Sequence, residues 1–264
     1  ITLNMALNNF LLNNSVMFMS IEMRYVEVYY RLMSMISGVP FSDFMLNNLT
    51  KDQKFSIAKS KLDTFYKPGE ASDSIYSNLL TSGSFNNFDQ ELKRGVVPFK
   101  DNRFHIIDDV QLSLARIDHY LNMMTTKYDI KMCVIDYLNI VKVEDRMDWK
   151  SQINISDSLK TLARKYKVIM ISPYQIDASG EARFAKGVLD SADKSFRFMP
   201  SDLSEDPTAL PFEVAKIRNG KAIKFNVHMD WDCLRIDSNK SKAIGGRILN
   251  KYGDDSKEQG RDLG

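Results

Sequence analysis

The sequence is poor in cysteine, has no long apolar run and lacks one common phosphate-binding pattern. Its two cysteines, Cys133 and Cys233, lie far apart without metal-ligand spacing, so we expect no cysteine metal site and a reducing compartment. No apolar run approaches the roughly 20 residues of a transmembrane helix, so we expect no membrane partner. The pattern GxxxxGK(S/T), whose lysine and hydroxyl hold phosphate and Mg²⁺, occurs nowhere in the chain.

The bulk composition allows one large α/β domain. The chain has 264 residues, of which 44% are hydrophobic and 27% are charged, and these values are ordinary for globular proteins. The length is sufficient to bury a sizeable core. The net charge of +2 does not exclude nucleic acid as a partner, because a basic stripe can be hidden in a balanced total.

The chain opens inside a predicted helix. The segment ITLNMALNNFLLNN begins at Ile1 rather than at a methionine, and no leading strand or N-cap residue precedes it. Its apolar residues recur at helical spacing on one face, at Leu3, Ala6, Leu7, Phe10 and Leu11. We therefore expect this chain to be a piece of a longer protein.

Short apolar runs then alternate with helical stretches, which is typical of a mainly parallel sheet with crossover helices. The expected strands are Val16–Ser20, Phe104–Asp108, Met132–Val141 and Val168–Ser172. The expected helices are Arg24–Ser37, which Gly38 and Pro40 end, Lys51–Phe65, Val110–Thr126 and Ser151–Tyr166. Two polar segments are expected to be loops, Lys142–Lys150 and Asp177–Ser195.

Beyond Ser172 the pattern changes to strands without helices. These are Ser195–Met199, Phe212–Ile217, Ile223–Trp231 and Leu234–Asp237, with a hairpin turn at Asn219–Gly220. We predict an α/β fold with a mainly parallel sheet, helices on both faces and an antiparallel edge hairpin. It forms one domain over residues 1–238, and a flexible polar tail follows over residues 239–264.

Two carboxylates follow apolar strands. Asp136 in MCVIDYLNIV ends a buried run, and open α/β sheets bind ligands at that edge. An aspartate there can hold Mg²⁺ through water, as in phosphoryl transfer, or it can simply cap a loop. Glu22 in MFMSIEM takes the same place on another strand. It could polarise an attacking water, or it could be an acid that complements a helix dipole.

Three further residues fit a phosphate site less specifically. Gln175 in VIMISPYQID ends the next strand, where its amide could contact a terminal phosphate, although an ordinary loop glutamine fits as well. Lys216 and Arg218 in KIRNG share one face of a strand, since side chains alternate with a period of two. They could bind an anion, or they could belong to a solvated strand face.

The order and separation of these segments resemble the C-terminal motor domain of DnaB-type replicative helicases. SIEM, IDD, DYLNI, SLKTLARKYKV and KIRNG resemble the family's SLEM, IDD, DYLQL, SLKALAKE and KQRNG, while Arg31 falls where the family has an arginine. The resemblance covers about Ile1–Ser238. It implies a RecA-like P-loop NTPase core with ATP and Mg²⁺ as cofactors.

The resemblance also implies a role for each site residue. Glu22 would activate water, Asp136 would serve Mg²⁺ through water, and Gln175 would sense the γ-phosphate. Lys216 and Arg218 would reach the nucleotide of the neighbouring subunit in a homo-hexamer, with Arg218 as the arginine finger.

The same resemblance implies that the ring encircles single-stranded DNA. The residues that it places in the DNA-contacting loops are Lys142, Arg146, Arg183, Lys186 and Gly187. Primase and a helicase loader are implied as further partners, and the cytoplasm of a bacterial cell or phage-infected host as the location.

The sequence departs from the family in three places. The phosphate-binding loop is missing, Tyr174 stands where the family usually has a serine, and the segment around Gly187–Asp193 is one residue short. We expect the parent protein to be an ATP-dependent DNA helicase and this chain alone to hydrolyse ATP poorly or not at all. A non-catalytic RecA-like DNA-binding or scaffold module and a recombinase-type RecA-like ATPase remain as alternatives.

Overall fold

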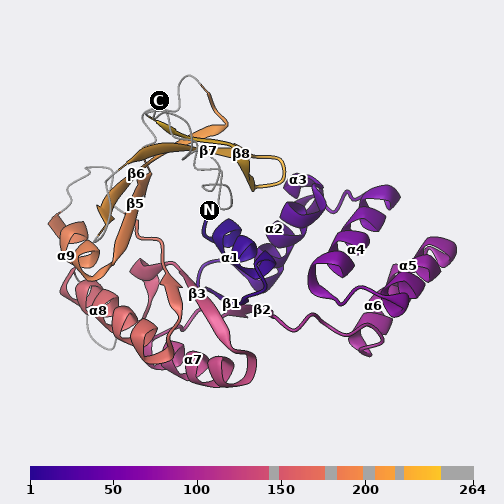
Figure 1. Ribbon diagram of the computed structural model, residues 1–264, viewed down its shortest axis with the longest axis horizontal. Helices are drawn as coiled ribbons and strands as arrows, with labels where there is room; N and C mark the ends of the chain where they lie inside the picture. Colours follow the sequence, from indigo (N-terminus) through magenta and orange to yellow (C-terminus); the bar gives the residue numbers. More distant parts are fainter. Residues whose placement is uncertain (143–148, 176–182, 199–205, 218–222, 245–264) are drawn as a thin grey trace, which may run out of the picture. The chain divides into compact units, whose positions relative to one another are not determined.

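The chain forms two compact units, each built on its own four-stranded sheet (Figure 1). The computed structural model describes residues 1–142, 149–175, 183–198, 206–217 and 223–244. The parallel unit comprises Ile1–Ser191 with Asp232–Leu234, and the antiparallel unit comprises Ala192–Trp231 with Arg235–Gly264. No described helix is long and apolar enough to cross a membrane.

The first unit is organised around a parallel sheet with strand order β2-β1-β3-β4. Its strands are β1 (Ser15–Ser20), β2 (Phe104–Asp108), β3 (Ile130–Asp136) and β4 (Ile169–Ile171). Every residue of β1 is buried, as is typical of a parallel strand covered on both faces. The four predicted strands are confirmed, although β3 ends at Asp136 and a short 3-10 turn, η1 (Leu138–Ile140), follows it.

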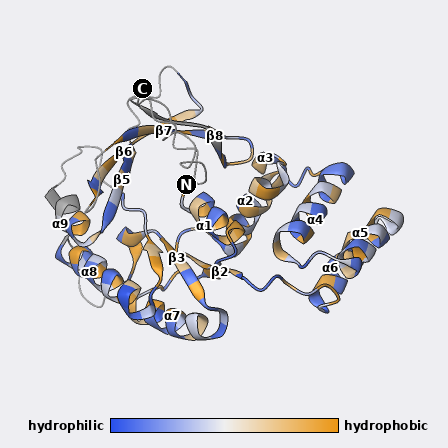
Figure 2. Cartoon of the chain, viewed as in Figure 1, coloured by the Kyte–Doolittle hydropathy of each residue, from blue (hydrophilic) through white to orange (hydrophobic). Residues whose placement is uncertain are grey.

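Helices cover both faces of this sheet. Helices α1 (Thr2–Leu11) and α2 (Tyr25–Ser37) pack on one face, and α7 (Leu114–Tyr128) and α8 (Trp149–Tyr166) pack on the other. In Figure 2, α7 and α8 carry both orange and blue segments, as expected for helices with one buried side.

Strand β1 contributes side chains to two separate cores. Val16 and Phe18 pack with α1 and α2, whereas Met17 and Met19 pack with α7 and α8. Because successive side chains of a strand point to opposite faces, this alternation follows directly from the sequence SVMFMS. Burying each such side chain stabilises the fold by about 1.5–3 kcal/mol.

Strand β3 carries one of the two cysteines. Cys133 is fully buried, and burial raises the pKa of its thiol to about 12. Cys233, in the turn before β8, is also buried. Both are free thiols.

Four further helices lie between α2 and β2 in the chain. They are α3 (Phe41–Met45), α4 (Lys51–Phe65), α5 (Glu70–Ser82) and α6 (Phe85–Lys93). Helices α4 to α6 enclose a small core of their own, made of Ala58, Leu62, Tyr66, Ile75, Leu79, Phe88, Leu92 and Val97. Only α4 was predicted from the sequence, and its predicted bounds are those observed.

The antiparallel unit contains β5 (Lys194–Phe198), β6 (Ala209–Ile217), β7 (Lys224–Asp230) and β8 (Arg235–Ile244) in sequential order. The predicted antiparallel strands are confirmed, but within the described residues they pair as a sheet of their own rather than as an edge of the parallel sheet. Strand β8 runs to Ile244, so the boundary predicted at Ser238 falls inside it.

One predicted loop contains a helix. Residues 177–195 were expected to be irregular, but α9 (Arg183–Ser191) occupies half of that segment and packs on α8. The expectation of a loop is therefore wrong for α9. The Asn219–Gly220 turn lies outside the described residues.

Candidate functional site

The carboxyl ends of the four parallel strands meet at one edge of the sheet. The register pairs Ser20 at the end of β1 with Asp136 of β3 on one side and with Asp108 of β2 on the other. Strand β4 is parallel to β3 and leads through Ser172 to Gln175 at the same edge. Because ligands of open α/β sheets bind beyond the carboxyl ends of the strands, this edge is the candidate site.

Glu22 stands on a tight turn at this edge. The buried Ser20 hydroxyl donates a hydrogen bond to the Met23 carbonyl (2.6 Å) and accepts one from the Met23 N–H (3.1 Å). The Ile21 N–H donates to the carbonyl of Asp136 at 3.1 Å. These bonds hold the exposed Glu22 beside the end of β3, as predicted. Glu22 lies two residues before Arg24, the N-cap of α2, whose first turn carries Glu27.

Asp136 is half-buried and lies in a mixed electrostatic environment. Burial raises the pKa of its carboxyl, and the Glu22 carboxylate raises it further. The guanidinium of Arg31 acts in the opposite direction on the same pKa. Among the described residues the Asp136 side chain makes no hydrogen bond.

Arg31 of α2 belongs to the same neighbourhood. Its guanidinium carbon lies 4.8 Å from the centre of the Phe41 ring. Its Nε is buried and has no hydrogen-bond partner among the described residues. The resemblance to the family matched Arg31 to a family arginine but assigned it no role. In the structure its charge is close enough to lower the pKa of Asp136.

The acidic pair after β2 has structural partners. Asp108 accepts a hydrogen bond from the Tyr25 N–H (2.8 Å) and so satisfies the start of α2. Asp109 is buried and accepts hydrogen bonds from Arg116 Nε (2.6 Å) and the Tyr120 hydroxyl (3.2 Å). These two carboxylates therefore help to fix the edge of the site.

Gln175 is exposed at the end of the segment that follows β4. Its backbone is hydrogen-bonded to the side chain of Asn139, in the neighbouring loop after β3. Its side-chain amide makes no hydrogen bond with any described residue. The structure thus brings Glu22, Asp136 and Gln175 to one edge, as the sequence predicted.

Of the other predicted site residues, Lys142 and Lys216 belong to the described part of the chain. Lys142 is exposed, and its N–H donates to the Leu112 carbonyl (2.8 Å) just before α7. Lys216 lies on β6 of the antiparallel unit, opposite Ser195. Arg146 and Arg218 lie outside the described residues.

Three predicted DNA-binding residues belong to α9. Arg183 and Lys186 lie in its first half, and their side chains are outside the described part of the structure. Gly187 packs against α8, where a Cβ atom would lie 2.8 Å from Ile153 Cγ1 and closer still to Cδ1. The lack of a side chain at Gly187 therefore has a packing reason.

The donor set at the edge fits Mg²⁺ only together with a nucleotide. Among the described residues, no group of three or more histidine, cysteine, aspartate or glutamate side chains could hold a metal ion. Mg²⁺ commonly binds through one or two carboxylates, with substrate phosphates and water as its other ligands. Asp136 suits that arrangement because its carboxylate has no hydrogen-bond partner among the described residues.

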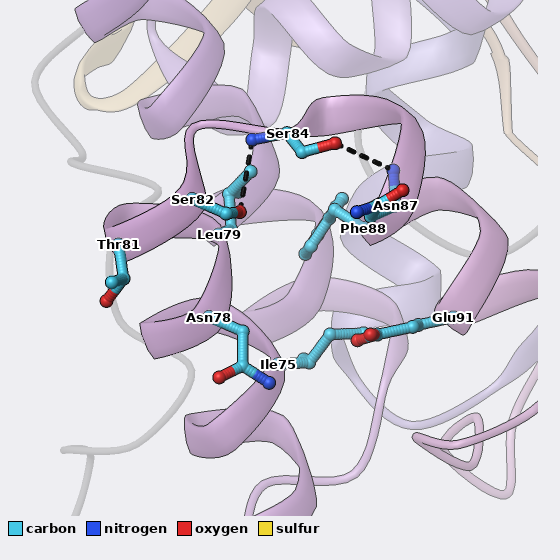
Figure 3. Close-up of a pocket in the computed structure, with 9 residues that line it drawn as sticks. All are labelled: Ile75, Asn78, Leu79, Thr81, Ser82, Ser84, Asn87, Phe88 and Glu91. Atoms are coloured by element: carbon cyan, nitrogen blue, oxygen red, sulfur yellow. Dashed lines mark hydrogen bonds between the residues drawn. The ribbon is translucent and has the colours of Figure 1, made fainter.

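A separate hollow of about 310 Å³ lies between α5 and α6 (Figure 3). Ile75, Leu79 and Phe88 form its apolar part. The Ser84 hydroxyl beside it accepts a hydrogen bond from the Asn87 N–H at 3.4 Å and thereby caps α6. This arrangement explains the local helix geometry, and we assign no chemistry to the hollow.

The comparisons with known proteins give the family and the fold of the chain. Residues 54–191, just over half of the chain, match the family model described as DnaB-like helicase C terminal domain. Two similar solved structures are a DnaB-like replicative helicase, described with its interactions with primase, and the ATPase domain of G40P. No curated protein matches the sequence.

The likeness to these structures establishes the fold. The DnaB-like replicative helicase superposes with a TM-score of 0.66 at 16% identity, covering 89% of this chain and 53% of that one. The ATPase domain of G40P gives a TM-score of 0.65 at 17% identity, covering 89% and 78%. The chain thus spans about half the length of the first structure, and the predicted RecA-like α/β fold is confirmed.

Proposed function

Because this chain belongs to the DnaB-like helicase C-terminal domain family, we propose that it is the motor domain of a replicative DNA helicase. In this proposal it couples ATP hydrolysis to translocation on single-stranded DNA and to duplex unwinding. The observation that carries the proposal is the meeting of Glu22, Asp136 and Gln175 at one edge of a parallel sheet.

Each residue of this edge has a proposed task. Asp136 serves Mg²⁺ through water and so helps to place the β- and γ-phosphates of ATP. Glu22, held beside it by the Ser20 turn, orients the attacking water and accepts its proton. Gln175 contacts the γ-phosphate through its side-chain amide. Mg²⁺ would supply charge neutralisation on the phosphates when it is bound.

The proposal extends to assembly and partners. Lys216 and Arg218 act on the nucleotide of a neighbouring subunit in a homo-hexamer, with Arg218 as the arginine finger. Lys142, Arg146, Arg183, Lys186 and Gly187 are the proposed contacts to single-stranded DNA. Such contacts go to phosphates and are independent of sequence. Primase, a helicase loader and a cytoplasmic location belong to the same proposal.

One observation favours a second candidate function. The GxxxxGK(S/T) pattern is absent from this chain, and its backbone N–H groups and lysine normally cradle the phosphates. A RecA-like module that binds DNA without hydrolysing ATP fits that absence. In either case we propose that this chain by itself hydrolyses ATP poorly or not at all.

The decisive experiment compares two substitutions in the full-length protein. Glu22→Gln should bind Mg²⁺-ATP normally and lower hydrolysis by about 10²–10⁴-fold, whereas Asp136→Asn should weaken Mg²⁺-ATP binding. Glu70→Gln, on the exposed first turn of α5, is the matched control and should change neither. A wild-type protein that binds single-stranded DNA but has no ATPase activity would support the non-catalytic alternative.

A further inference from the structure

The side chain of Asn139 binds both backbone polar groups of Gln175. Asn139 Nδ2 donates to the Gln175 carbonyl at 3.0 Å, and Asn139 Oδ1 accepts from the Gln175 N–H at 2.9 Å. Asn139 lies in η1, three residues after Asp136, and Gln175 follows β4. One side chain therefore joins the loops that carry two of the candidate site residues.

This pair of bonds continues the pairing of β3 with β4 beyond the strands. The ladder itself ends at Val134 and Ile171. Past that point the Ser172 hydroxyl donates to the Ile135 carbonyl (2.8 Å), and the Leu138 N–H donates to the Pro173 carbonyl (3.1 Å). The Asn139 amide is the last of these links and the one that reaches Gln175.

An asparagine suits this position because its amide has a donor and an acceptor side by side, as a peptide group does. An aspartate at the same place would keep the acceptor and lose the donor, and it would set a carboxylate oxygen against the Gln175 carbonyl. Alanine would leave both backbone groups of Gln175 to water. The bond pair thus depends on the amide itself.

The residue before Gln175, Tyr174, is also held by a hydrogen bond. The Tyr174 hydroxyl donates a hydrogen bond to Gln152 Oε1 of α8 at 2.8 Å. Tyr174 replaces the serine usual in the family, so this chain fixes the residue before Gln175 to α8 and fixes Gln175 itself to η1. Among the described residues, the Asn139 contact is the one that ties Gln175 to the loop that carries Asp136.

We propose that Asn139 is a positioning residue that holds Gln175 at a set distance from Asp136. A shift of the Asp136 loop on binding Mg²⁺-nucleotide is then transmitted to Gln175 through the Asn139 amide. The structural half of this proposal stands on the two hydrogen bonds, and its catalytic half rests on the function proposed above.

Amide hydrogen exchange tests the structural half in this chain without nucleotide. Gln175 is exposed, so protection of its N–H depends on Asn139. Asn139→Ala should speed exchange at Gln175 by about 10-fold, the size of one lost hydrogen bond, and leave the Cys133 amide of β3 unchanged. Asn139→Gln, which keeps an amide, should retain most of the protection. The control is Asn122→Ala, at an exposed position on α7.

Steady-state ATPase in the full-length protein tests the catalytic half. Asn139→Ala should lower kcat per nucleotide-bound site by about 10-fold to 10²-fold, as expected when a contacting group is misplaced by about 1 Å. The KM for ATP should stay close to the wild-type value. A general loss of folding would reduce the number of binding sites instead of the rate per site.

The outcomes separate the two proposals. Unchanged exchange at Gln175 in Asn139→Ala, or equal loss of protection in the Ala and Gln variants, overturns the role of Asn139. An unchanged rate per site in an active enzyme overturns it too. If the wild-type protein has no ATPase activity, the proposed function fails, and the exchange data alone decide whether Asn139 positions Gln175.

Discussion

The ionised carboxylate of Asp136 is disfavoured by the folded chain around it. Burial and the Glu22 carboxylate raise its pKa above the usual value, which is about 3.9 in an unfolded chain. The unfolded chain therefore loses this proton at a lower pH than the folded one. The free energy of unfolding therefore falls as pH rises from the pKa of Asp136 in the unfolded chain through its pKa in the folded chain.

Asp136→Asn should consequently raise the free energy of unfolding of this chain at pH 7, and the gain should disappear below about pH 3.9. Urea unfolding at several pH values measures the effect. Asp118→Asn is the control of opposite sign, because Lys165 and Tyr166 lower the pKa of Asp118 and its removal should cost stability at pH 7. A gain for Asp136→Asn that persists at pH 3 would contradict the argument.

At the level of single residues, the sequence predicted the groups that follow strands and missed the groups that hold them. Asp136, Glu22 and Gln175 each come after an apolar run, so their place at the sheet edge was foreseeable. Ser20 and Asn139 act through hydrogen bonds within a turn or between loops of different strands. No local pattern indicates such bonds, although Ser20 lies in the SIEM segment and Asn139 in the DYLNI segment.

Among the secondary-structure elements, the contact between α8 and α9 depends on Gly187. Alanine would gain about 1 kcal/mol of helix propensity over glycine. Its Cβ would also meet Ile153 Cγ1 at 2.8 Å, and overpacking of this kind costs about 1–3 kcal/mol. The steric cost outweighs the propensity, so Gly187→Ala should destabilise the chain by up to about 2 kcal/mol.

The sign of this effect should reverse when Ile153 is removed. In an Ile153→Ala background no atom opposes the new Cβ, and Gly187→Ala should stabilise by up to about 1 kcal/mol. A double-mutant cycle by chemical denaturation measures the coupling between the two sites. Equal destabilisation in both backgrounds would show that the Ile153 contact is not the reason for the glycine.

The accuracy of the predicted bounds differed from one element to another. β2 and α4 were predicted with their observed bounds. The apolar residues Leu138, Ile140 and Val141 extended the predicted third strand past Asp136, but they are accommodated in and after the 3-10 turn η1. Helices α5 and α6 were not predicted, although α4, which also buries only two side chains, was.

For the molecule as a whole, the sequence predicted the fold class but not how its strands group into sheets. Alternation of strands and helices indicated the parallel sheet, and the strand run after Ser172 indicated antiparallel pairing. A period of two shows that a segment is a strand, but it does not show which strand lies beside it. The separate grouping of β5 to β8 therefore became visible only in the structure.

The proposed ring predicts complementation between two inactive subunits. Arg218→Ala in the full-length protein should bind ATP and hydrolyse it about 10³–10⁵-fold more slowly, because an arginine supplied in trans stabilises the transferring phosphoryl group. Glu22→Gln should be inactive because it cannot accept the proton of the attacking water. In mixed rings some interfaces pair an intact Glu22 with an intact Arg218, so ATPase activity should partly return.

The mixing experiment needs evidence that mixed rings form, which native mass spectrometry of differently tagged subunits provides. If mixed rings form and no ATPase activity returns, Arg218 acts within its own subunit or has no catalytic role. The alternative stated from the sequence, a solvated strand face, would then describe Lys216 and Arg218 better.

Because Cys133 is buried, the rate at which its thiol is alkylated can report how often the parallel sheet opens. Alkylating reagents attack the thiolate, and with a pKa of about 12 and no exposed surface this thiol reacts only when β3 separates from its neighbours. The rate of alkylation at Cys133 thus measures how often the sheet opens. Asp136 ends the same strand, so a ligand bound there stabilises the closed sheet by its binding free energy and lowers the alkylation rate of Cys133. The affinity of the ligand can therefore be measured from alkylation rates, without an assay of ATP turnover.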